Sequence, residues 1–167
     1  REPDDLERTV ALDCAGSVVV NRFAGTREQP RRGLVVLHSD VGIRLVELDP
    51  QTGKRIEGNV AINIAIDCEA TDLIYRDGWY YLLGTHGTCC DGANSTYNIV
   101  VGRAKKVTGP YLDNMGRDML RGGGKMVVAA GGRVMGPGHF GLIDLGDGVQ
   151  KMSCHYEADL DQGGRSV

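Results

Sequence analysis

The chain has 167 residues, which is long enough for one sizeable hydrophobic core, and we expect a single domain over residues 1–167. Its 19 basic and 22 acidic residues give a net charge of −3 without a basic block, so we expect no nucleic-acid partner. No apolar run approaches the ~20 residues that span a bilayer, so we expect no membrane partner either. The 25 glycines lie among short Val, Ile, Leu and Tyr runs, which favours many tight turns and an all-β fold.

The cysteines do not follow a known scaffold. They stand at positions 14, 68, 89, 90 and 154, which matches neither a multi-disulfide framework nor a zinc spacing. The adjacent Cys89 and Cys90 form either a vicinal disulfide or two thiols, and we interpret both alternatives as structural. The chain begins Arg-Glu-Pro without Met or a signal sequence, so we expect a processed chain or an excerpt of a longer one.

In chain order, the first predicted unit has an acid ahead of a β-branched strand. Asp13 follows an apolar start and precedes the strand at 18–20. Two further strands are expected at 33–39 and 41–48, the second with the alternation of a half-buried strand. A turn with Pro and Gly follows at 49–55.

The second unit carries the strongest hairpin signal. Glu69 stands just before the short strand 73–75, which we expect to pair with 80–83 across Asp77 and Gly78. A carboxylate at the start of such a strand lies at the rim of a sheet.

A long loop at 84–96 and a strand at 97–103 continue this unit. The loop is too long for a plain turn. Its Asn94 and Ser95 either line a sugar-binding cleft or cap the loop itself.

In the third unit, apolar runs at 126–130 and 133–135 lead to Gly136-Pro137-Gly138-His139. We expect a hairpin between 142–144 and 149–156.

Three polar residues thus stand at equivalent places, since Asp13, Glu69 and His139 each precede or open a short strand. Small antiparallel sheets repeated along a chain indicate a β-propeller, in which the innermost strands converge on a central channel. The approximate blades are 10–60, 61–115 and 120–167. We therefore expect the three residues to meet around that channel.

Several motifs together resemble family 43 of the glycoside hydrolases, in particular its arabinanase-like members. They are Glu69-Ala70 with the aromatic hairpin, the run from Cys89-Cys90 to Asn98, 101–103, 108–111, 122–124 and Gly136-Pro137-Gly138-His139. The resemblance extends from about residue 10 to the C-terminus. It implies a five-bladed β-propeller that cleaves arabinose- or xylose-containing polysaccharides with inversion, in a secreted or periplasmic protein.

The resemblance also implies roles for residues. Glu69 matches the general acid, Asp13 the second acid that tunes the general acid and orients the sugar, and His139 the residue that holds Ca²⁺ or another ion in the channel. The family shows Asp-Pro at the second acid, whereas this chain has Asp13-Cys14. Only twelve residues precede Asp13, so the general base of the family is expected outside this chain, which resembles about three of five blades.

An inverting glycosidase needs a protonated carboxyl group and a carboxylate about 6.5 to 9.5 Å away that activates water. Glu69 suits the first role. The alternative function is a non-catalytic carbohydrate-binding or self-assembling propeller fragment. Open blades expose strand edges, and we expect a missing segment or a second copy of the chain to cover them.

Overall fold

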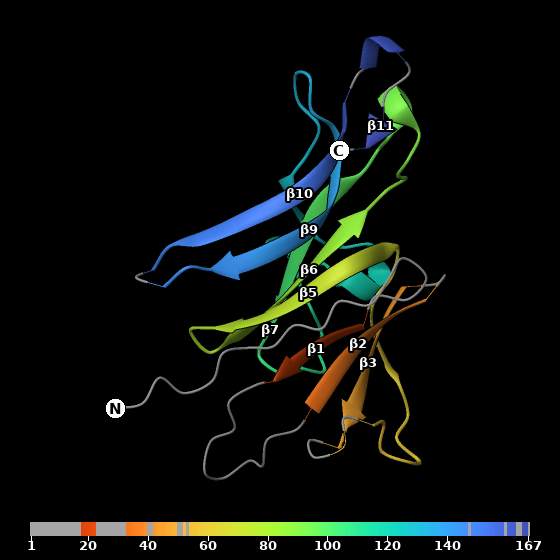
Figure 1. Cartoon of the computed structure of the whole chain (residues 1–167). Helices are drawn as coiled ribbons and strands as arrows, with labels where there is room; N and C mark the ends of the chain where they lie inside the picture. Colours follow the sequence, from red (N-terminus) through yellow and green to blue (C-terminus); the bar gives the residue numbers. More distant parts are fainter. Residues whose placement is uncertain are drawn as a thin grey trace.

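The computed structural model describes residues 18–22, 33–39, 42–49, 52, 54–146, 148–158, 160–162 and 165–166, and within these the strands form three antiparallel sheets (Figure 1). The first sheet has the order β1-β2-β3-β4, with strands Val18–Arg22, Gly33–Ser39, Gly42–Leu48 and Ile62–Ala65. The second has the order β5-β6-β7-β8, with strands Cys68–Arg76, Trp79–His86, Asn98–Ala104 and Lys125–Val128. The third has the order β9-β10-β11, with strands Met135–Asp144, Gln150–Ala158 and Arg165–Ser166.

The helices of the described residues are single 3₁₀ turns. They are η1 (Gly92–Asn94), η2 (Met119–Arg121) and η3 (Leu160–Gln162). In the described part of the chain, no helix is long and apolar enough to span a membrane.

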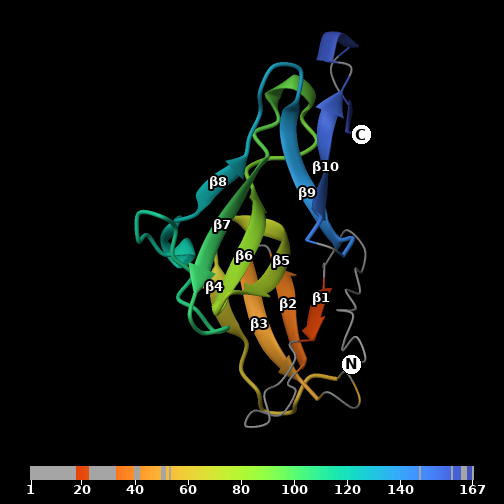
Figure 2. The ribbon, with the colours of Figure 1, turned by 90° about the vertical axis from the view of Figure 1, so that its left-hand side faces the viewer.

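The second sheet reaches both of its neighbours through its first strand, β5. β5 contacts β1, β2 and β3 of the first sheet and also β9 of the third sheet. The second sheet therefore lies between the other two, as Figures 1 and 2 show from two directions. Small antiparallel sheets that follow one another along the chain in this way are the arrangement of propeller blades.

The hairpin between β5 and β6 follows from its turn residues. Arg76 pairs with Trp79, so Asp77 and Gly78 form a two-residue loop. Both loop residues have positive φ, 50° and 77°, as a type I′ turn requires. The predicted Asp-Gly hairpin is confirmed, and it sends β6 back toward the end of the sheet where β5 begins.

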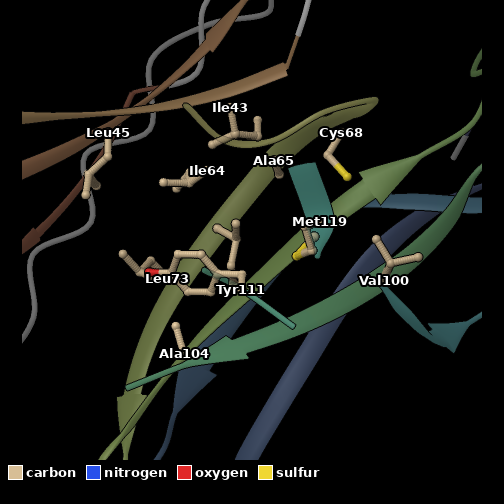
Figure 3. Packing of buried hydrophobic residues seen from close by; sticks show 11 residues of the cluster. Ile43, Leu45, Ile64, Ala65, Cys68, Leu73, Val100, Ala104, Tyr111 and Met119 are labelled. Carbon is tan, nitrogen blue, oxygen red and sulfur yellow. The ribbon is translucent and has the colours of Figure 1, made fainter. Parts of the chain in front are cut away.

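The hydrophobic core lies between the first and second sheets (Figure 3). Residues of β3 and β4, among them Ile43 and Ile64, contribute from one side and Leu73 of β5 from the other. Tyr111 and Met119, from the connection between β7 and β8, fill the space between them and are fully buried. Removing such side chains from water is the main source of stability for this pair of sheets.

Cys68 is part of this core, and its burial makes the stability of the fold fall as the pH rises in the alkaline range. Burial, with a smaller effect of the Asp67 carboxylate, raises the pKa of the Cys68 thiol from 9.0 to about 12. Since the folded-state pKa lies above the unfolded one, the thiol stabilises the fold fully below pH 9, and this contribution is lost as the pH rises toward 12.

We therefore expect the urea midpoint to fall less between pH 8 and pH 10.5 in Cys68→Ala than in the wild type. Burial also raises the pKa of Tyr111, which acts in the same direction, so the substitution reduces the fall without removing it. Chemical denaturation of both proteins at the two pH values measures the difference. An equal fall in both would contradict the prediction.

The sheets divide the chain differently from the expected blade boundaries. The strand at 62–65 pairs with β3 and so belongs to the first sheet. The run expected to open the third unit instead forms β8, which pairs with β7 of the second sheet. The fourth strand of each four-stranded sheet follows a long excursion of the chain, and a local pattern does not show which sheet it rejoins.

Candidate active site

Glu69 lies at one end of the second sheet, as the second residue of β5. Its side chain is half-buried, and Glu69 pairs with Thr85 of β6. The ladder then shifts register before Asp72, and Ala70 adopts a left-handed conformation with φ of 42°. A bulge of this kind changes the direction of a strand and of the side chains on it. The β5 strand thus bends at the residue that the sequence predicts as the proton donor.

His139 lies inside β9, whereas the sequence placed it ahead of a strand. Its backbone also has a positive φ, 47°, and its N–H donates a hydrogen bond of 3.0 Å to the Thr85 hydroxyl. The imidazole is exposed and stacks on that of His155, with ring centroids 5.6 Å apart. The structure therefore brings Glu69 and His139 to the same end of the sheet, through their shared neighbour Thr85. Asp13, the third predicted member, lies outside the described residues.

The long loop between β6 and β7 lies at this same end, because β6 returns from the distant hairpin. Ser95 is buried, and its hydroxyl donates to the Thr88 carbonyl at 2.9 Å, which is a bond within the loop. Asn94 is exposed in η1, which contacts β9 and β10. Of the two predicted sugar-binding residues, only Asn94 thus presents its side chain to solvent.

A disulfide joins Cys89 and Cys90 at the tip of this loop. The structure thereby selects one of the two alternatives that the sequence left open. Cys90 has φ of 61°, and its N–H donates to the Glu157 carboxylate of β10 at 3.1 Å. Because Glu157 is buried, this hydrogen bond attaches the loop to the interior of the third sheet.

A calcium ion at His139 stays a prediction. Ca²⁺ prefers six to eight oxygen ligands. The hydroxyl of Thr85 accepts from the His139 backbone, and the neighbour of the His139 ring is another imidazole. Among the described residues no group of three or more His, Cys, Asp or Glu side chains could hold a metal ion, so other oxygen ligands, such as backbone carbonyls and water, would have to complete a calcium site here.

Sequence reasoning missed Thr85, His155 and Glu157 as parts of this end of the sheet. Thr85 lacks a motif of its own, and its place opposite Glu69 depends on the bulge. His155 has no ligand spacing to a second histidine, because its partner in the stack is on a neighbouring strand. Glu157 meets its partner Cys90 across 67 residues of chain.

The chain is similar to a known protein family and to several of its members. The model of the family described as "Glycosyl hydrolases family 43" matches residues 24–167. An extracellular endo-α-(1→5)-L-arabinanase of Bacillus subtilis is 44% identical over 107 residues, 62% of this chain and 33% of that protein. An extracellular exo-α-(1→5)-L-arabinofuranosidase of Cellvibrio japonicus is 48% identical over 91 residues, 54% of this chain and 26% of that protein.

Solved structures give the same result. An α-L-arabinanase of Cellvibrio cellulosa in complex with arabinohexaose superposes with a TM-score of 0.75 and 27% identity, over 91% of this chain and 51% of that one. The native arabinanase of Bacillus subtilis gives 0.64 and 34%, over 81% and 47%. The chain thus spans about half of these structures and about a third or less of the curated relatives named above.

Proposed function

This chain belongs to family 43 of the glycosyl hydrolases, and on that premise we propose that it carries the general acid of an inverting hydrolase that cleaves arabinan or a related arabinose-containing polysaccharide. The family and the structural matches confirm the predicted β-propeller fold and the predicted family. The observation that carries the proposed function is the half-buried Glu69 on a bulged first strand, paired with Thr85, whose hydroxyl accepts from the His139 backbone.

Glu69 donates a proton to the oxygen of the bond that breaks, while a carboxylate on the opposite face of the sugar activates water. We assign this water-activating general base to a residue outside the described part of the chain. Asp13 stays the predicted second acid. A sugar bound at this end of the sheet would lie beside Glu69, with the His139 imidazole and the exposed Asn94 as further neighbours.

Two finer proposals follow, one from the names of the relatives and one from exposed apolar side chains. Both curated relatives carry "extracellular" in their names, which supports secretion of this protein as well. The turn of the β9–β10 hairpin and the strand end beside it expose apolar side chains, with Ile143, Leu145 and Val149 at 56%, 53% and 47%. This supports the expectation that further chain, or a second copy, covers the outer sheets.

The test is hydrolysis of linear arabinan by the full-length protein, followed by proton NMR of the first products. We expect cleavage with inversion at the anomeric carbon. Retention of configuration would contradict the assigned mechanism. Binding of arabino-oligosaccharides without any cleavage would favour the non-catalytic alternative.

A further inference from the structure

Thr85 is buried at the point where the strand of Glu69 meets the strand of His139. Its side chain is 1% exposed, and both of its branches are used. The hydroxyl accepts the hydrogen bond from the His139 N–H at 3.0 Å. The methyl group lies against Gly138, where an added Cβ would overlap both this methyl group and the Tyr97 ring. A β-branched residue with one hydroxyl fits this place on both sides.

The hydrogen bond from His139 supports an unfavourable backbone conformation. A positive φ is uncommon for a residue with a side chain and persists where the surroundings hold it. This bond joins the His139 main chain, in the third sheet, to a side chain of the second sheet. Loss of the acceptor leaves the N–H without that partner and favours a different local conformation, which would move the imidazole.

The other side of Thr85 concerns Glu69. The two residues form a regular ladder pair, beyond which the register shifts toward Asp72. Thr85 is therefore the residue of β6 that pairs with β5 immediately before the bulge. One residue thus contacts the backbone that carries Glu69 and the backbone that carries His139.

We propose that Thr85 is a positioning residue, whose hydroxyl sets the place of the His139 imidazole relative to the Glu69 carboxyl group. This inference rests on the proposed function, in which both groups face the sugar. Thr85 itself does not contact substrate. It acts across the boundary between the second and third sheets, where no shared strand fixes the distance between Glu69 and His139.

Two substitutions separate positioning from packing. Thr85→Val keeps the shape and the methyl contact with Gly138 but removes the acceptor. Thr85→Ser keeps the acceptor but removes the methyl group, so it loses buried apolar surface. We expect Thr85→Val to lower kcat/KM on arabinan on the order of tenfold to a hundredfold, the usual cost of a misplaced active-site group. Thr85→Ser should stay within about threefold of the wild type, because a serine hydroxyl has the same hydrogen-bonding capacity as that of threonine.

Two further measurements accompany the kinetics. Thermal unfolding shows whether activity simply follows stability; a purely structural role predicts that the less stable variant is also the less active one. Histidine ring resonances in ¹H–¹⁵N NMR spectra, assigned with His139→Gln, report the position of the imidazole without any substrate. They should shift in Thr85→Val for His139 and its stacking partner His155, and keep their wild-type positions in Thr85→Ser. Thr108→Val, which removes an exposed hydroxyl beyond β7, should change none of these values.

The outcomes distinguish this inference from the proposed function. If the wild type does not cleave arabinan, the proposed function fails, and the NMR comparison still tests Thr85. If the wild type is active, and Thr85→Val keeps both its activity and its His139 resonances, the positioning role is wrong.

Discussion

We expect Glu69→Gln to lower kcat of the full-length protein on linear arabinan by about 10²- to 10⁴-fold, the usual contribution of a general acid. The amide has nearly the same shape as the carboxyl group but cannot deliver a proton to the leaving oxygen. Binding should change little, because the substitution affects proton transfer more than contact. Initial rates of reducing-sugar release at saturating arabinan measure the effect.

The leaving group provides a sharper check of the role of Glu69. A dinitrophenyl arabinoside departs without protonation, so its cleavage should be much less sensitive to Glu69→Gln than that of arabinan. The matched control is Asp67→Asn, the same chemical change two residues earlier at an exposed position with positive φ, which asparagine tolerates. This control should keep wild-type activity. Equal losses on both substrates would show that Glu69 acts otherwise than as a proton donor.

The second large effect concerns stability. We expect Tyr111→Ala to lower the free energy of unfolding by about 3 to 5 kcal/mol, as for other large aromatic side chains removed from a core. Tyr111 is fully buried between the first and second sheets, next to Met119. Its hydroxyl donates to the Val107 carbonyl at 2.6 Å, so the substitution removes a hydrogen bond as well as the ring. Urea denaturation followed by circular dichroism measures the change.

Two tyrosine variants separate the contributions. Tyr111→Phe keeps the ring and should cost about 1 kcal/mol, the net value of a typical hydrogen bond. Tyr75→Ala removes a tyrosine that is 52% exposed, and its cost should stay within about 1.5 kcal/mol for the loss of its contact with the Tyr80 ring. A similar loss in Tyr75→Ala and Tyr111→Ala would mean that the core does not depend on the region around Tyr111.

Local patterns predicted much of the fold because strands and turns depend on neighbouring residues. The strand at 33–39 and the hairpin at Asp77 and Gly78, the latter from its turn chemistry, were predicted, and both are present. The long loop was predicted too, but β6 continues to His86 inside its expected range. The ladder with β7 extends that strand, since His86 pairs with Asn98.

The sheet to which β8 belongs could not be predicted from local sequence patterns. Residues 126–128 of β8 are apolar, as predicted, yet the chain passes through Tyr111 and η2 before β8 pairs with β7. That excursion fills the core between two sheets, and the sheet that the chain then rejoins depends on this packing. No property of the segment itself distinguishes the last strand of one sheet from the first strand of the next.

The sequence by itself determined the family, the antiparallel sheets and Glu69 as the predicted acid, because these depend on motifs and on short-range periodicity. Counting back from the hairpin would place Glu69 opposite His86, since a regular ladder keeps one register. Only the tertiary structure shifts that register by a bulge and places Thr85 opposite Glu69. It also brings His139 to the hydroxyl of Thr85 across 54 residues of chain. Such contacts depend on how two sheets pack, and packing is decided by the whole core rather than by any one segment.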